Sequence, residues 1–281
     1  MSKKAIITGI GVVAAVAVAG GIWAHTSSTT KVAAKDTTVT VGIVGDSSRE
    51  LWQDISKRTE KKYNVKLKIK VFSDYVKPNQ ALIDGSLDIN AFQTKIFFDD
   101  QNKNLGNKLV SIGKTVISPI RLYSLKVDKL ADLKDGMQIA IPNDATNEER
   151  ALNLLTQAKL IKYNQKVTNP TVKDITSNPK HLDIVEVSSD QTVADLKSAD
   201  AAVINGNFAQ DAKLAKKTIL LTQDVSDPKT AAPYINIIAA RKDRAKTKAF
   251  REVVKEFQTK ATEKKINALY DGFESAAWNL K

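Results

Sequence analysis

"VTVGIVGDSSRELWQDISKRTEKKYNVKLKIKVF", residues 39–72, predicts how the fold begins. The apolar run 39–44 predicts a buried strand. Residues 65–72 alternate apolar side chains with lysine, the period-two pattern of a strand with one solvated face. Between them, residues 48–62 carry apolar side chains at helical spacing. The order is therefore β-α-β, the unit from which parallel sheets are built.

The alternation of strand-like and helix-like segments continues along the chain. Further strands are predicted at 86–92, at two places within 115–125, and at 137–141, 182–187, 201–204 and 234–240. Helices are predicted near 79–84, 97–104, 147–160, 190–198 and 207–216, and again after residue 240, with the last ending near Trp278. This alternation favours an α/β protein with mostly parallel strands.

Two helix starts carry the spacing of a capping box, in which a hydroxyl residue is followed three positions later by a glutamate. Ser47 and Glu50 have this spacing before the first helix, and Thr146 and Glu149 have it before a later one. The second pair predicts a helix that starts near Asn147.

The composition excludes several classes of function. The 281 residues include no cysteine and only two histidines, so Cys-ligated metals, thiol catalysis and a two-histidine metal site lack their parts. We therefore expect no metal, no cofactor and no enzymatic activity. The 43 Lys+Arg against 31 Asp+Glu give a net charge of +12. Because the lysines are dispersed and lack interleaved aromatics, nucleic acid is not an expected partner.

The N-terminus predicts export. Lys3 and Lys4 precede an uncharged apolar run, residues 5–24, long enough to cross a bilayer. The positive-inside rule then places the rest of the chain on the extracytoplasmic face of the cell membrane. We expect residues 1–25 to be a signal or anchor segment, with cleavage left open, and residues 26–37 to be a Ser/Thr-rich tether.

Arg150 raises a question of charge, since it lies early in a predicted helix, where the macrodipole is positive. The free N–H groups of that helix start, at Asn147, favour an anion, and a guanidinium adds a fork of donors suited to a carboxylate. The alternative is a surface ion pair of Arg150 with Asp144, Glu148 or Glu149.

Aromatic and amide side chains suggest the rest of a ligand site. Tyr75, Phe92 and Phe97 fall close together in the sequence, although core packing is the alternative for each. Asn205 follows a predicted strand, and Asn236 interrupts one, where a buried amide needs hydrogen-bond partners. Together with Arg150, these residues fit an amino-acid-like zwitterion with an apolar side chain.

Several segments, in order and spacing, resemble one known family. "FSDYVKPNQAL" (72–82), "GSLDINAFQ" (85–93), "IAIPNDATNEERALNLL" (139–155), "VINGNFA" (203–209) and "PYINIIAARKD" (233–243) resemble the signature segments of the methionine-binding (NlpA-type) substrate-binding proteins of ABC importers. The resemblance implies a periplasmic-binding-protein fold of type II, with two α/β lobes around a ligand cleft. Lobe 1 would comprise 38–118 plus 233–281, and lobe 2 would comprise 119–232.

The resemblance also assigns roles to residues of this chain. It places the ligand carboxylate on Arg150 and the two ligand-contacting amides on Asn205 and Asn236. The side-chain pocket falls on Tyr75, Phe92, Thr94 and Phe97. Asn147 joins the expected site through its place at the helix start.

This chain departs from the family pattern at three points. Thr94 stands where the family usually has histidine, so the pocket loses a polar group. Glu148 and Glu149 stand where the family tends to have glycine, and they could narrow the entrance or accept a ligand amine. The family is typically anchored through a lipidated cysteine, which an uncleaved N-terminal helix would replace here.

The function implied is that of a non-enzymatic extracytoplasmic receptor. It would bind L-methionine or a related apolar amino acid and deliver it to an ABC permease and its ATPase. Two alternatives remain open: a binder of short Met-containing peptides, and a basic surface adhesion protein that has lost transport specificity.

Overall fold

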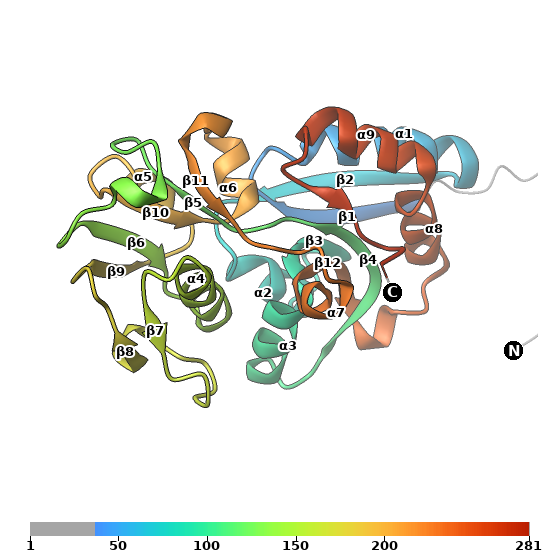
Figure 1. Cartoon of the computed structure of the whole chain (residues 1–281). Helices are drawn as coiled ribbons and strands as arrows, with labels where there is room; N and C mark the ends of the chain where they lie inside the picture. The colour runs from blue at the N-terminus through green and yellow to red at the C-terminus, as the bar shows by residue number, and fades with distance from the viewer. Residues whose placement is uncertain (1–36, 281) are drawn as a thin grey trace, which may run out of the picture. The chain divides into compact units, whose positions relative to one another are not determined.

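The computed structural model describes residues 37–280, which form a mixed α/β fold with two main sheets (Figure 1). The predicted anchor (1–25) lies outside the described residues, as does all but the last residue of the predicted tether (26–37). In the described range, no helix combines the length and apolar character needed to span a bilayer.

The first sheet has six strands. From edge to edge they are β13 (Ser275–Ala276), β4 (Leu109–Ile117), β12 (Ile235–Arg241), β3 (Ile89–Thr94), β1 (Thr37–Val44) and β2 (Val65–Phe72). β1 runs parallel to β2 and β3, as the β-α-β pattern predicts. β12 is antiparallel to β3 and β4, and β13 is antiparallel to β4.

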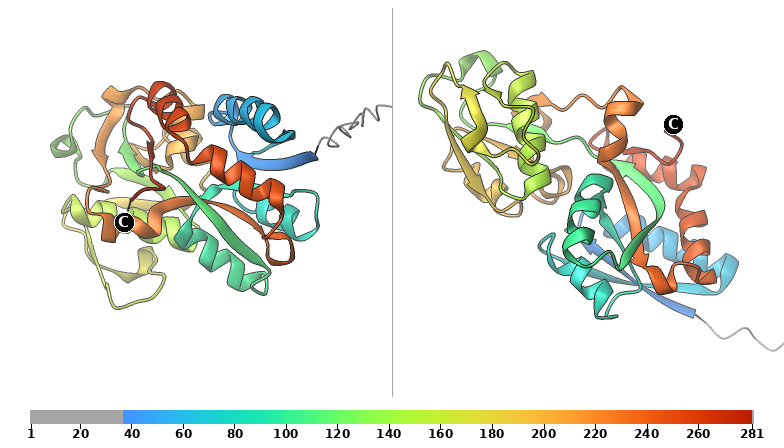
Figure 2. Two further views of the ribbon diagram at one scale, coloured as in Figure 1. Left: turned by 90° about the vertical axis from the view of Figure 1, so that its right-hand side faces the viewer. Right: turned by 90° about the horizontal axis from the view of Figure 1, so that it is seen from below.

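Five of the described helices accompany the six-stranded sheet. They are α1 (Arg49–Tyr63), α2 (Lys77–Ile83), α3 (Lys95–Asn104), α8 (Lys248–Phe257) and α9 (Lys260–Tyr270). α1, α8 and α9 lie side by side although α1 is distant from the others in sequence (Figures 1 and 2). Trp52 of α1 packs on Phe257 of α8 with ring centroids 5.3 Å apart, and both side chains are buried. Burial of such large apolar surfaces is the main stabilising term that holds the tail helices to the sheet.

The second sheet has five strands. They are β11 (Ile219–Thr222), β5 (Arg121–Tyr123), β10 (Ala201–Ile204), β6 (Gln138–Pro142) and β9 (Asp183–Val187), in that order. β6 is parallel to β9 and β10, whereas β5 is antiparallel to β10 and β11.

Four of the described helices lie in this part and the connecting segments, of which the first is long and the other three are short. They are α4 (Ala145–Gln157), α5 (Thr192–Asp195), α6 (Gly206–Asp211) and α7 (Pro228–Ala231), with a small antiparallel pair β7 (Lys162–Tyr163) and β8 (Ile175–Ser177). The 3-10 turns are η1 (Leu130–Asp132), η2 (Val172–Asp174), η3 (Lys216–Thr218), η4 (Ala232–Tyr234) and η5 (Lys242–Arg244).

The chain passes between the two sheets twice. It leaves the six-stranded sheet after Ile117 and enters the five-stranded sheet at Arg121. It returns between Thr222 and Ile235. The lobe boundaries given above, 38–118 plus 233–281 and 119–232, stay a prediction.

Three details of the sequence prediction are wrong. The strands are mixed rather than mostly parallel, because β5 and β12 each follow a crossing between the sheets and not a β-α-β connection. No helix ends near Trp278 in the described tail; a short strand, β13, pairs there with β4. The strand expected at 86–92 begins later, at Ile89.

Both predicted capping boxes are also wrong. α1 starts at Arg49, and its N-cap, Ser48, makes no side-chain capping bond. α4 starts at Ala145, two residues earlier than predicted, because Asp144 is its N-cap and accepts the Asn147 backbone N–H at 3.1 Å. A carboxylate caps as well as a hydroxyl and also favours the positive end of the helix.

Candidate ligand-binding site

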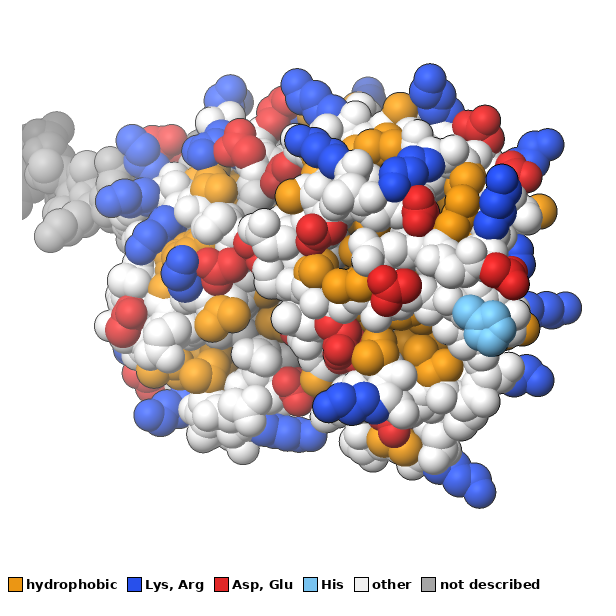
Figure 3. Space-filling view, turned by 90° about the vertical axis from the view of Figure 1, so that its left-hand side faces the viewer, with side chains coloured by type: hydrophobic (Ala, Val, Ile, Leu, Met, Phe, Trp, Pro, Cys, Tyr) orange, Lys and Arg blue, Asp and Glu red, His pale blue; other side chains and the backbone are white. Residues whose placement is uncertain are grey.

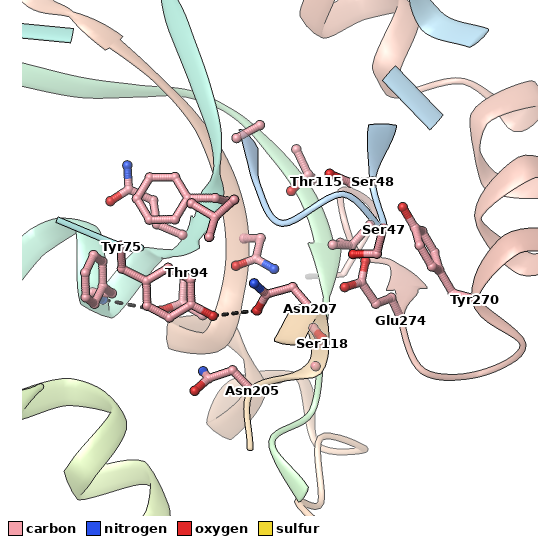
Figure 4. Close-up of a pocket in the computed structure, with 18 of the residues that line it drawn as sticks. Ser47, Ser48, Tyr75, Thr94, Thr115, Ser118, Asn205, Asn207, Tyr270 and Glu274 are labelled. Atoms are coloured by element: carbon pink, nitrogen blue, oxygen red, sulfur yellow. Dashed lines mark hydrogen bonds between the residues drawn. The ribbon is translucent and has the colours of Figure 1, made fainter. Parts of the chain in front are cut away.

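A cavity of about 70 Å³ is lined by residues that come from elements of both sheets (Figure 4). One water needs only about 10–15 Å³ by a comparable measure, so the space suits several waters or a small ligand. All eight residues predicted to bind ligand line it: Tyr75, Phe92, Thr94, Phe97, Asn147, Arg150, Asn205 and Asn236. The structure thus brings these residues together, while their contact with a ligand stays a prediction.

Arg150 is buried in the cavity wall, with 3% of its surface exposed. Its Nε donates to Gln223 Oε1 at 2.8 Å, and its Nη2 donates to the Ser118 carbonyl oxygen at 2.8 Å. The guanidinium also lies 4.7 Å from the centroid of the Tyr234 ring. Burial lowers the pKa of Arg150 to about 10, which still leaves it cationic at neutral pH.

The surface ion pair considered for Arg150 does not form. None of the ion pairs within residues 37–280 includes this guanidinium. Its hydrogen-bond partners are neutral oxygens, which solvate the cation without neutralising it. A buried charge in that state favours an incoming anion.

Amide side chains line the cavity next to the start of α4. Asn205, which follows β10, donates from Nδ2 to Asn147 Oδ1 at 2.8 Å. Asn147 in turn donates from Nδ2 to the capping carboxylate of Asp144 at 2.9 Å. The other amide oxygen, Asn205 Oδ1, is buried and has no hydrogen-bond partner. Buried polar atoms are rarely left in that state, so this oxygen is available to a ligand donor.

Aromatic rings form another part of the wall. Tyr75 stacks on Phe92 at 5.7 Å between centroids and meets Phe97 edge-on at 5.8 Å. Phe208 of α6 lies 5.0 Å from Tyr75, which lies between β2 and α2, so rings from segments next to each sheet meet. The Tyr75 hydroxyl donates to Asn207 Oδ1, a bond drawn in Figure 4. The arrangement suits an apolar side chain that packs between ring faces and edges.

Thr94 and Asn236 lie opposite each other on β3 and β12. Thr94 also caps α3 by accepting the Phe97 N–H at 3.3 Å, which explains why a hydroxyl residue fits that position. Both side chains are partly buried and line the cavity.

A buried amide network fixes β3 from behind. Asn79 donates to Gln93 Oε1 at 2.8 Å, and Gln93 donates back to Asn79 Oδ1 at 2.7 Å. Asn90 donates to the same Asn79 oxygen at 2.9 Å and accepts from Gln93 at 2.9 Å. A satisfied network of this kind fixes the position of the strand, and with it the Phe92 ring that β3 carries.

Comparison with known families identifies the family of this chain. The family model described as NlpA lipoprotein matches residues 39–278. The chain belongs to the NlpA lipoprotein family. One relative, the D-methionine-binding lipoprotein MetQ of Salmonella typhi, is 37% identical over 245 residues, covering 85% of this chain and 88% of the relative. MetQ of Escherichia coli (strain K12) is 36% identical with the same coverage.

Solved structures of related proteins share the fold of this NlpA-family chain. The substrate-binding protein of a methionine transporter from Streptococcus pneumoniae has a TM-score of 0.79 at 38% identity, over 86% of this chain and 96% of that one. A nutrient-binding protein from Burkholderia cenocepacia, bound to methionine, has a TM-score of 0.79 at 38% identity, over 85% and 99%. Protein PG110 from Staphylococcus aureus has a TM-score of 0.81 at 36% identity, over 85% and 94%.

Neither Glu148 nor Glu149 lines the cavity of this NlpA-family protein, so the structure gives no support to either as an acceptor for a ligand amine. Glu148 is buried on another side of α4, where it accepts the Val172 N–H at 3.0 Å. Burial, together with the neighbouring Glu186 carboxylate, raises the pKa of Glu148 to about 8.

Sequence reasoning missed several residues of the cavity. Ser47 and Ser48 come from the loop before α1, Ser118 from the first crossing, and Tyr270 and Glu274 from the C-terminal tail. The sequence offered no signal for Glu274, since a glutamate in a charge-rich tail is the usual pattern of a solvated surface, and it offered none for Tyr270. Gln223, which accepts from Arg150, lies in the returning crossing, where no local pattern marked it.

Proposed function

We propose that this protein is the extracytoplasmic substrate-binding protein of an ABC importer, with L-methionine or a close apolar analogue as its ligand. It would bind the amino acid in the cavity and deliver it to a membrane permease that is driven by its ATPase. In this role the chain is a binding protein and not an enzyme.

One observation carries the proposal: a buried guanidinium with neutral partners faces the same cavity as a wall of aromatic rings. Arg150 would bind the ligand carboxylate in a charge-assisted, forked pair. Asn205 Oδ1, buried without a partner, would accept from the ligand's polar end, and Asn236 would complete that contact. Tyr75, Phe92 and Phe97 would enclose the apolar side chain, with Thr94 at the rim.

The fold supports a mechanism of closure. We infer a periplasmic-binding-protein fold of type II, in which two lobes move about the crossings between the sheets and enclose the ligand. Closure would exclude water and strengthen each polar contact. An N-terminal segment within residues 1–25 would hold the protein at the membrane, beside its permease.

Isothermal titration of the purified protein with the twenty amino acids tests this function. We expect methionine to bind and charged amino acids to give no heat. L- and D-methionine are titrated separately, because the relatives named above carry D-methionine in their names. If neither methionine nor another apolar amino acid or short peptide binds, the transport function is wrong.

The adhesion alternative gains no support from the face drawn in Figure 3. Figure 3 shows Lys and Arg around the outline of one face, with Asp and Glu set between them. Such mixed charge is typical of a solvated surface and not of a site for an anionic polymer. Salt-dependent binding to anionic cell-wall polymer, with no amino acid bound, would favour adhesion instead.

A further inference from the structure

The cavity has a second polar end that the proposed function does not use. Figure 4 shows Glu274 and Tyr270 on the side away from Tyr75, with Asn207 and Ser118 between the two ends. Ser47 and Ser48 border the same end from the loop before α1. Four polar side chains, from two distant parts of the chain, therefore converge where only apolar residues would be needed to bury a methionine side chain.

Glu274 is an acidic group without a cationic partner. Its Oε1 accepts Gln210 Nε2 at 3.1 Å, and no lysine or arginine of the described residues forms an ion pair with it. Burial raises the pKa of this carboxyl to about 7, and Asp211 acts in the same direction, while Gln210, Ser118 and Arg121 oppose the shift. A carboxylate in such a place is unfavourable until a cation reaches it.

Arg121 does not meet this need. Its guanidinium donates to the carbonyl oxygens of Pro119, Gly272 and Phe273 at 3.1–3.2 Å. It also lies 4.7 Å from the centroid of the Phe273 ring. Both terminal nitrogens thus donate to backbone carbonyls, two of which directly precede Glu274 in the chain, and Arg121 forms no ion pair with that carboxylate.

Hydroxyl groups complete the arrangement around the carboxylate. Tyr270 is 4% exposed, and its hydroxyl is buried with no hydrogen-bond partner. Ser48 is the N-cap of α1 but makes no capping bond with its side chain. A carboxylate and adjacent hydroxyl oxygens are the acceptors that the three N–H donors of a primary ammonium require.

We propose that Glu274, Tyr270 and Ser48 form a subsite for a primary ammonium group of the ligand. This rests on the proposed function, since it concerns the same cavity and the same class of ligand. The ammonium is either that of the free amino acid, in place of the contact with Asn205 Oδ1 given above, or the N-terminus of a short peptide that ends in methionine. Both have the same chemistry, and the arms of the experiment distinguish them.

The test compares two ligand pairs that differ only in the amino group. One pair is L-methionine and 4-(methylsulfanyl)butanoate; the other is L-alanyl-L-methionine and N-propanoyl-L-methionine. Affinities are measured by calorimetry for the wild type, for Glu274→Gln and for the control Glu148→Gln. Glu148 is also a buried glutamate with a raised pKa, but it does not line the cavity.

We expect Glu274→Gln to weaken the amine-bearing member of one pair about tenfold to a hundredfold and to leave its amine-free partner within about threefold. A loss of affinity for methionine means that the subsite binds the ammonium of the free amino acid. A loss of affinity for the dipeptide alone means that it binds a peptide N-terminus. Glu148→Gln should change neither pair. Thermal unfolding of each variant confirms that it folds, and Glu274→Asp should restore part of the preference for an amine.

An unchanged preference for the amine in Glu274→Gln, in both pairs, would overturn the subsite and leave the transport function standing. If the wild type binds none of the four compounds, the subsite fails, and the transport function fails as well when no other apolar amino acid or short peptide binds. The two failures are thus separate results of one set of titrations.

Discussion

The two charged ends of the cavity differ in how far the protein itself satisfies them. Arg150 donates to Gln223 and Ser118 and lies over the Tyr234 ring, so it is held in place by fixed groups. Glu274 accepts one amide N–H, and the hydroxyl of Tyr270 in the same wall has no partner. The cationic end is therefore organised before ligand binds, whereas the anionic end would be completed by the ammonium of the proposed subsite.

This difference suggests that the two ends of the cavity have different roles in ligand binding. A preorganised cation costs little ordering free energy when a carboxylate arrives, so it should set the affinity shared by all ligands. A carboxylate that lacks a partner discriminates between ligands with and without a cationic group, because only a cation offsets the cost of its buried charge. Substitutions at each end and between the two ends test whether they differ in this way.

Arg150→Ala should produce the largest effect. Removing the guanidinium deletes charge-assisted bonds to the ligand carboxylate, and we expect methionine affinity to fall about tenfold to a few hundredfold. Calorimetry measures the change, with Arg49→Ala as the matched control, since Arg49 pairs with Asp46 at the surface. Equal affinities for wild type and Arg150→Ala would remove the cationic end from the site.

Gly206→Ala should disturb the region between the two ends. A Cβ at Gly206 would lie 2.0 Å from Ser118 Oγ, so one of the two must shift. We expect a loss in methionine affinity of about tenfold, because overpacking of this kind displaces neighbouring groups. The double variant Gly206→Ala/Ser118→Ala removes the clash and should recover most of the affinity. A double variant no better than the single one would contradict this explanation.

The raised pKa values of Glu148 and Glu274 predict how stability depends on pH. The folded-state pKa values, about 8 for Glu148 and about 7 for Glu274, lie above the usual glutamate value of 4.5. At a pH between the usual value and the raised one, the folded state therefore binds more protons than the unfolded state. Stability should therefore fall as pH rises from about 4.5 to 8. The groups facing Glu148 are Glu186 and Asp144, both of which raise its pKa further.

Thermal unfolding of ligand-free protein at pH 5 and pH 8 measures this dependence. We expect Tm to fall by roughly a few degrees over the interval, and Glu148→Gln to remove part of the fall. Glu274→Gln should remove a further part. A Tm that rises with pH in the wild type, or a fall of the same size in both variants, would contradict the assignment.

Tyr75→Phe should have the smallest effect. The change keeps the ring that stacks on Phe92 and removes only the hydroxyl that donates to Asn207. We expect methionine affinity to fall about twofold to fivefold, the range for one neutral hydrogen bond. A tenfold loss would mean that the hydroxyl contacts the ligand directly.

The cationic end could be predicted from sequence because its residues lie in local patterns. Arg150 lies in the first turns of a helix whose start is predicted by the turn residues before it. Asn205 follows one predicted strand, and Asn236 lies inside another. The exact cap was wrong, since Thr146 and Asp144 are both good cap residues and only the backbone conformation decides between them. The wrong cap did not displace Arg150 from the cavity.

The anionic end could not be predicted in the same way. Glu274 follows a turn in which Asp271 and Gly272 both have positive φ, 43° and 81°, and this turn directs the chain back from α9 to β4. Where that return lies depends on packing of the tail helices against α1, over 200 residues away in sequence. Long-range packing of this kind leaves no periodic pattern near the residue it positions.

Arg150 also connects the site to the motion that the proposed function requires. It binds the Ser118 carbonyl in the outward crossing, and Gln223 and Tyr234 in the returning one. The guanidinium that would hold the substrate is therefore bonded to both connections about which the lobes would turn. Coupling of this kind is reciprocal. A permease that binds one arrangement of the two connections changes this protein's affinity for substrate. Substrate changes the protein's affinity for the permease by the same factor. Release of substrate can therefore be driven from the membrane side.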